Sequence, residues 1–217
     1  VNPGTVTQSL FHRFKVAGVN RLSIGVQSFA DSNLRFLGRI HSKDQACAAI
    51  SDARREGFHN LGLDLIYGLP GQTMDSWHRD LAFALSWEPA HISCYMLSYE
   101  EHTPLWNAWK RNEFKPLSDD AVADLYLFMT DFLLSNGYAQ YEISNFAKSR
   151  PSGSEDYRSR HNRKYWDFTP YFGFGPSAHS MKGDVRWWNH PDLLLYLEAI
   201  ATGRAPVSGS EHLSTDQ

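Results

Sequence analysis

The chain has 217 residues, of which 42% are hydrophobic and 21% charged, the composition of an ordinary globular protein with a buried core. Its net charge of -3 argues against a protein that wraps nucleic acid, and no apolar run approaches the roughly 20 residues that span a bilayer. The two cysteines, Cys47 and Cys94, form no disulfide framework and no secretory leader is visible, so we expect a reducing, cytoplasmic location.

Both ends of the sequence predict a fragment of a longer protein. The chain begins with VNPGTV rather than with a methionine, and it ends in the polar stretch SGSEHLSTDQ. We therefore expect further parts of the fold outside these 217 residues.

Strand and helix patterns alternate along the first two thirds of the chain. Apolar residues at every second position predict strands, and apolar stripes at helical spacing behind a capping residue predict helices. The expected strands are 21–27, 60–70, 91–97 and 137–146, and the expected helices are 42–57, 74–87 and one that runs from Ser118 to Gly137. Ser42 is the expected N-cap of the first helix, and Ala46, Ile50 and Ala53 form its apolar stripe.

The two faces of the first strands differ in chemistry. One face carries Leu22, Ile24 and Val26, whereas the other carries Ser23, Gly25 and Gln27, continued by Gly62 and Asp64 on the next strand. Alternating strands and helices imply parallel strands with crossover helices, as in a doubly wound sheet or a (β/α) barrel. The large aliphatic face would meet the helices and the small polar face would line a ligand-holding interior. This asymmetry favours an α/β fold of the (β/α) barrel type with parallel strands.

Three polar residues in this half are candidates for ligand binding. Asp64 is a carboxylate among apolar strand residues, so it needs a hydrogen-bonding partner, and a ribose diol or a neighbouring protein group would serve. Gln27 is expected on the same inward face of the sheet as Asp64. Arg39, in LGRIH, could hold a ligand carboxylate, although a surface position is the commoner role for an arginine.

The alternation stops after residue 146, and a less regular C-terminal segment follows. Its most informative stretch is HNRKYW at 161–166, in which His161 could ligate iron while Tyr165 and Trp166 stack on a planar macrocycle. A packed loop is the alternative. In YFGFGPSAHS, at 171–180, the Gly pattern superficially matches a nucleotide fingerprint; we reject it because Pro176 disfavours the turn and no βαβ unit surrounds it.

Aromatic residues make up 14% of the chain and crowd toward residues 95–190. This suits a pocket for something large and flat, with an aromatic core as the simpler alternative. Cys47 and Cys94 lie on apolar faces and are interpreted as small core residues.

Many ordered motifs together resemble one family. GVNRLSIGVQSF, LGRIH, LDLIYGLPGQT, HISCYMLSYEEHTPL, GYAQYEISNFA, HNRKYW and YFGFGPSAHS resemble the radical S-adenosylmethionine proteins related to oxygen-independent coproporphyrinogen III oxidase, in particular the HemW-type branch of heme chaperones. The resemblance covers roughly residues 1–190 and implies a partial (β/α) radical-SAM barrel that holds S-adenosylmethionine and a [4Fe-4S] cluster.

The resemblance also implies roles for single residues. Gln27 and Asp64 match contacts to the ribose and neighbouring polar atoms of S-adenosylmethionine, Arg39 a contact to its methionine carboxylate, and Ser98 a backbone contact. The family's C-x-x-x-C-x-x-C cluster motif is absent from this chain, and we expect the cluster ligands upstream of Val1.

HNRKYW matches a motif that the chaperone branch associates with heme. It implies heme binding by His161, Asn162, Tyr165 and Trp166, with His161 as the candidate iron ligand and His179 as a lower-ranked one. The expected function is heme binding and transfer to an unidentified acceptor protein, through which the protein would meet a membrane peripherally, with no nucleic-acid partner.

Two alternatives stay open: an oxidoreductase that decarboxylates coproporphyrinogen III, and an unrelated barrel without a cofactor. Whether the protein is an enzyme is left undecided. The expected organisation is a barrel part at 1–146, a porphyrin-binding segment at 147–190 and the start of a truncated region at 191–217.

Overall fold

The computed structural model describes residues 1–149 and 156–214. The chain divides into two compact units, Val1–Arg158 and Ser159–Gln217. Each unit has its own sheet, and the two are described separately. The domain boundaries expected after residues 146 and 190 stay predictions.

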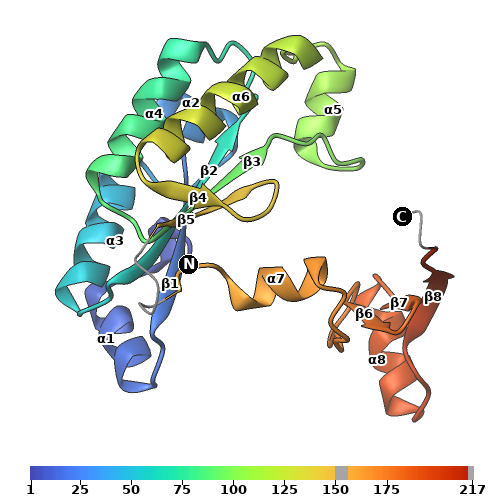
Figure 1. Ribbon diagram of the computed structural model, residues 1–217. Coiled ribbons are helices and arrows are strands. Elements are labelled where there is room, and N and C mark those ends of the chain that lie inside the picture. Colours follow the sequence, from blue (N-terminus) through green and yellow to red (C-terminus); the bar gives the residue numbers. More distant parts are fainter. Residues whose placement is uncertain (150–155, 215–217) are drawn as a thin grey trace. The chain divides into compact units, whose positions relative to one another are not determined.

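Among the described residues of the first unit, one sheet has the strand order β1-β2-β3-β5-β4. The three strands β1 (Arg21–Gln27), β2 (Asn60–Tyr67) and β3 (His91–Met96) run parallel, as the alternation predicts. Helices α3, α4 and α6 cover one face of the sheet (Figure 1). The α/β fold with parallel strands is therefore confirmed.

Except for α2, the helices of this unit begin at a residue whose side chain caps them. Their bounds are η1 Pro3–Thr5, α1 Gln8–Val16, α2 Asp31–Phe36, α3 Lys43–Arg55, α4 Met74–Ser86, α5 Pro104–Lys110 and α6 Asp119–Ser135. Ser42 forms a reciprocal capping box with Gln45, and Ser118 caps α6 as expected. Gly57 and Gly137 follow helices with positive φ, which their lack of a Cβ permits.

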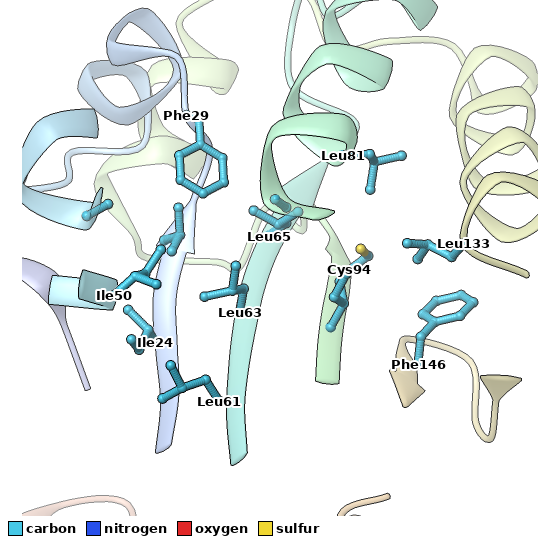
Figure 2. Packing of buried hydrophobic residues seen from close by; sticks show 14 of the residues in the cluster. Ile24, Phe29, Ile50, Leu61, Leu63, Leu65, Leu81, Cys94, Leu133 and Phe146 are labelled. Atoms are coloured by element: carbon cyan, nitrogen blue, oxygen red, sulfur yellow. The ribbon is translucent and has the colours of Figure 1, made fainter. Parts of the chain in front are cut away.

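The core lies between the sheet and these helices (Figure 2). The aliphatic face of β1 is buried, and Leu61, Leu63 and Leu65 continue it on β2 with 1% exposure or less. Cys94 of β3 is also buried in this core, as predicted, and Cys47 packs against it only partly buried. The alternation read from the sequence thus fixes which face of each strand meets the helices.

The stretch 137–146 is not the single strand that its pattern predicts. It forms a hairpin of β4 (Tyr138–Gln140) and β5 (Asn145–Lys148), and β5 pairs antiparallel with β3. A turn reverses the chain because the Glu142 carboxylate accepts hydrogen bonds from the backbone of Ser144 and the side chain of Asn145.

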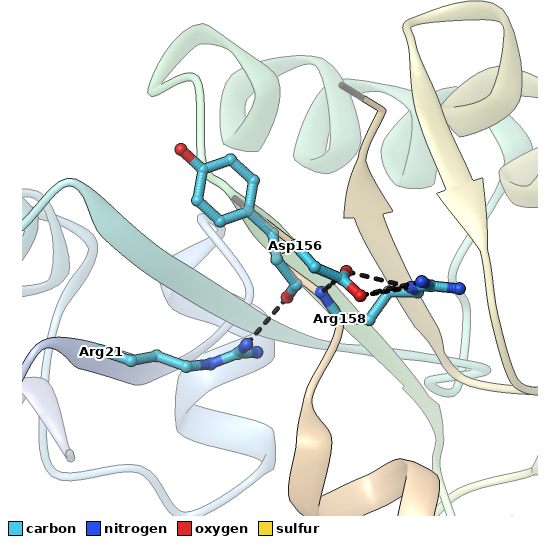
Figure 3. A network of polar contacts seen from close by, with 4 residues as sticks. Arg21, Asp156 and Arg158 are labelled. Carbon is cyan, nitrogen blue, oxygen red and sulfur yellow. Dashed lines mark hydrogen bonds and ion pairs between the residues drawn. The ribbon is translucent and has the colours of Figure 1, made fainter. Parts of the chain in front are cut away.

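Two short segments are tied to β1. The N-terminal amine of Val1 donates to the Ser23 carbonyl at 2.6 Å, while the Gly25 N–H donates to the Val1 carbonyl at 2.9 Å. Near the end of the unit, Arg21 donates to the Tyr157 carbonyl at 2.8 Å, beside an Asp156–Arg158 ion pair (Figure 3).

The second unit contains α7 (Arg160–Trp166) and α8 (Leu193–Ala201). Its antiparallel sheet has the order β6-β7-β8, formed by His179–Lys182, Val185–Asn189 and Val207–His212. HNRKYW is helical here, because Ser159 caps α7 by accepting from the Asn162 N–H. No helix in the described parts of the chain is long and apolar enough to cross a membrane.

Candidate functional site

The polar face of the first sheet carries Asp64 in the middle of β2. Its Oδ1 accepts a hydrogen bond from the Ser23 hydroxyl at 2.7 Å, while Oδ2 has no donor among the described residues. Asp64 is half-buried and lies opposite Ser93 of β3. One carboxylate oxygen is thus available to accept from a hydroxyl group of a ligand.

Gln27 ends β1 in an unusual backbone conformation. Its φ is +69°, which is rare for a residue with a Cβ, and the β1–β2 register shifts between Ile24 and Gln27. A Cβ on Gly25 would lie 2.8 Å from the Gln27 Nε2, so the missing side chain of Gly25 leaves space for the amide. That amide forms no hydrogen bond within the described residues although Gln27 is only 8% exposed.

Arg39 follows α2 and lines a small hollow. This space of about 290 Å³ is lined by Asp31, Leu34, Arg35, Arg39, Ile40, His41, Ser42 and Gln45. No carboxylate of the described chain pairs with the Arg39 guanidinium, which is therefore available to an anionic group.

Ser98 lies beyond the C-terminal end of β3, at the edge of a larger hollow of about 800 Å³. The walls include Tyr67, Met96, Trp106 and Trp109. Burial raises the pKa of Tyr67 to about 12, so its hydroxyl stays protonated. The aromatic crowding of the sequence indicated such a hollow, but not which residues form it. Arg39 and Ser98 thus line two different hollows of the first unit.

In the second unit, helix α7 brings His161 and Tyr165 together. They are four residues apart, the spacing that stacks side chains on one helix face. The Tyr165 hydroxyl lies 3.1 Å from the His161 Nε2, and the two rings meet edge to face at 5.1 Å. Both side chains are exposed, as is Trp166 at 53%.

A hollow of about 470 Å³ opens beside this helix face, within the second unit. It is lined by Tyr165, Trp166, Phe168, Arg186, Glu211 and Leu213. Arg186 and Glu211 form an ion pair at 2.5 Å across the β7–β8 pairing. Sequence reasoning missed this pair because no local pattern predicts which residues of two strands lie opposite each other.

His179, the lower-ranked ligand candidate, lies apart from the hollow. It is exposed at the start of β6, and its ring packs against Trp188 with centroids 5.6 Å apart. The geometry therefore favours His161, which shares a helix face with Tyr165, one aromatic wall of the hollow.

Residues 1–84 match the model of the radical SAM superfamily. The chain belongs to the radical SAM superfamily. The matched residues include Gln27, Arg39 and Asp64.

Curated relatives of this radical SAM chain are named heme chaperone HemW. The chain is 39% identical to that of Mycobacterium tuberculosis (strain H37Rv), covering 99% of this chain and 54% of the relative. It is 36% identical to that of Bacillus subtilis, covering 100% and 55%, and 40% identical to that of Escherichia coli, covering 82% and 44%. The chain thus spans about half the length of the curated relatives it matches.

The structure of coproporphyrinogen III oxidase (HemN) from Escherichia coli, a radical SAM enzyme, has the same fold. The TM-score is 0.76 at 24% identity, covering 100% of this chain and 51% of that one. At this identity the likeness concerns the fold alone, and it confirms the expected partial radical SAM barrel.

The radical SAM family implies two bound groups, S-adenosylmethionine and an iron–sulfur cluster. The residues of this chain suit the first but not the second. Open hydrogen-bonding capacity at Asp64, Gln27 and Arg39 suits the hydroxyls and the carboxylate of S-adenosylmethionine. No three His, Cys, Asp or Glu side chains in the described residues converge as metal ligands, so these residues do not fit an iron–sulfur cluster.

Proposed function

We propose that this radical SAM chain is part of a heme chaperone that binds heme and passes it to an acceptor protein. The relatives named heme chaperone HemW support this reading. The observation that carries it is the exposed α7 face, where His161 lies beside Tyr165, an aromatic wall of a hollow that Trp166 also lines. Heme is the cargo in this proposal.

The α7 face offers heme the two kinds of contact it needs. An imidazole is a common iron ligand, and exposed aromatic rings can pack against a flat macrocycle. The His161 Nε2 already lies 3.1 Å from the Tyr165 hydroxyl, so iron binding through this atom requires that hydroxyl to move aside. Asn162 supplies its backbone N–H to the helix cap and is proposed only as a supporting residue.

We propose further that Gln27, Asp64 and Arg39 bind S-adenosylmethionine, with Ser98 as a backbone contact. Asp64 and Gln27 would hold the ribose and neighbouring polar atoms, and Arg39 the carboxylate of the methionine part. When bound, this molecule supplies an adenosyl group linked to a sulfonium. The charge on Arg39 and the open oxygen of Asp64 would fix its two ends.

A heme titration of the full-length protein, followed by Soret absorbance, tests the chaperone reading. We expect saturable binding, and a loss of affinity of about tenfold or more with a shifted Soret band in His161→Ala, since an iron ligand is removed. The exposed His59, in the first unit, provides the control His59→Ala. His179→Ala separates the two candidate ligands.

The outcomes divide the alternatives. Equal and weak binding by the parent and His161→Ala would contradict the chaperone proposal and leave coproporphyrinogen turnover as the activity to assay. A loss confined to His179→Ala would keep heme binding but assign the iron to His179.

A further inference from the structure

Helix α4 places a carboxylate, Asp80, on its buried face. Asp80 is 5% exposed and shares this face with Trp77, Leu81 and Ala84. A carboxylate buried among apolar side chains is costly unless hydrogen bonds satisfy it. Its partners are therefore informative about what this helix does.

Both Asp80 oxygens accept hydrogen bonds from the turn that follows β1. Oδ2 accepts from the Ser28 hydroxyl at 2.5 Å, and Oδ1 accepts from the Phe29 N–H at 3.0 Å. The Ser28 oxygen in turn accepts from the Ala30 N–H at 3.1 Å and the Asn33 side chain at 3.0 Å. Since two donors use the lone pairs of the Ser28 oxygen, its single hydrogen must go to an acceptor, which Asp80 provides.

These hydrogen bonds hold Ser28, the residue that follows Gln27, in place. The Ser28 N–H donates to the Val26 carbonyl at 2.9 Å, which closes a three-residue turn around Gln27 at φ +69°. Turns of this kind with a positive central φ are rare and strained, and such strain persists only where the surroundings impose it. The buried His41 holds the same Val26 carbonyl through Nε2 at 3.1 Å.

We propose that Asp80 is a positioning residue for Gln27. By holding Ser28 and Phe29 from α4, it keeps the strained turn closed and holds the Gln27 amide in the space left by Gly25. Asp80 thereby sets the affinity for the ligand that Gln27 contacts. This inference rests on the proposed S-adenosylmethionine site, and it adds a residue from the opposite, helix-covered face of the sheet.

The test compares Asp80→Asn with its parent in the full-length, cluster-loaded protein. An asparagine can still accept from Phe29, but its amide nitrogen cannot accept the Ser28 hydrogen, so the network breaks without loss of volume. We expect the dissociation constant for S-adenosylmethionine to rise about tenfold, with faster amide hydrogen exchange at Ser28 and Phe29. Asp75→Asn, an exposed carboxylate of the same helix, serves as the matched control and should change neither quantity.

A double-mutant cycle with Gln27→Ala separates positioning from general destabilisation. In the Gln27→Ala background, Asp80→Asn should change the dissociation constant less than twofold, because the amide to be positioned is gone. The same tenfold loss in both backgrounds would overturn the positioning role. Ser28→Ala repeats the cycle if Asp80→Asn does not fold.

The two proposals fail in different ways. An unchanged affinity in Gln27→Ala would show that Gln27 does not contact the ligand, which removes the proposed site and the inference that depends on it. Weakened binding in Gln27→Ala with unchanged affinity and exchange in Asp80→Asn would overturn the role of Asp80 alone.

Discussion

At the scale of single residues, His91 makes the stability of the first unit depend on pH. Burial, with the Arg21 charge as a second cause, lowers the pKa of His91 from 6.5 to about 3. Its Nε2 lies 2.7 Å from the Tyr141 hydroxyl, and its buried Nδ1 has no hydrogen-bond partner among the described residues. The folded state therefore holds this imidazole neutral at every pH above about 3.

The sign of the effect follows from where protons bind. Below pH 6.5 the unfolded chain binds a proton that the folded one does not, so the stability from His91 is complete above 6.5 and is lost as pH falls toward 3. Between pH 7 and pH 5 the free energy of unfolding should fall by about 2 kcal/mol from this residue. Urea unfolding at both pH values measures it.

His91→Gln provides the comparison, because it cannot gain a proton and other titrating groups are common to both proteins. We expect the pH-dependent loss to be smaller in the variant by about 2 kcal/mol. An equal loss in both proteins would mean that another group causes it.

At the scale of elements, patterns of neighbouring residues predicted the strands and helices best. Alternation placed β1, β2 and β3, and capping residues placed the starts of α3 and α6, because these depend on neighbours in sequence. The hairpin at β4 and β5 was read as one strand, since its turn depends on the Glu142 side chain. The helix α7 was not predicted, because seven polar and aromatic residues show no apolar stripe.

The cap of α3 gives an element-scale prediction. Ser42 accepts from the Gln45 N–H at 3.3 Å, and the Gln45 side chain accepts from the Ser42 N–H at 2.8 Å. Ser42→Ala should lower the free energy of unfolding by about 1 kcal/mol, measured by urea denaturation, because an N–H at the helix start loses its acceptor. Ser42→Asn retains a capping oxygen and should keep most of the free energy of unfolding that Ser42→Ala loses. An equal loss in Ser42→Asn would argue against the cap as the cause.

At the scale of the whole molecule, the candidate sites depend on contacts that no sequence pattern records. The inward parity of Gln27 and Asp64 was predictable, but the strained turn and its tie to Asp80 join residues 51 to 52 positions apart. Likewise, the Arg186–Glu211 pair joins residues 25 positions apart. Sequence therefore indicated which side chains share the polar face of the sheet, whereas their supporting contacts required the fold.

The division into two units leads to a last prediction. Asp64 and its hydrogen-bond partner belong to the first unit, and the His161–Tyr165 pair with its hollow belongs to the second. Asp64 and His161 share no hydrogen-bond partner among the described residues, and effects at such sites add, so each binding constant should respond to its own residue only. Asp64→Ala should weaken S-adenosylmethionine binding about tenfold while changing heme affinity less than twofold, and His161→Ala should do the reverse. Calorimetry with each ligand, alone and with the other present, measures both constants. A change of heme affinity in Asp64→Ala would instead reveal a coupling free energy between the sites, which by reciprocity must appear in both titrations.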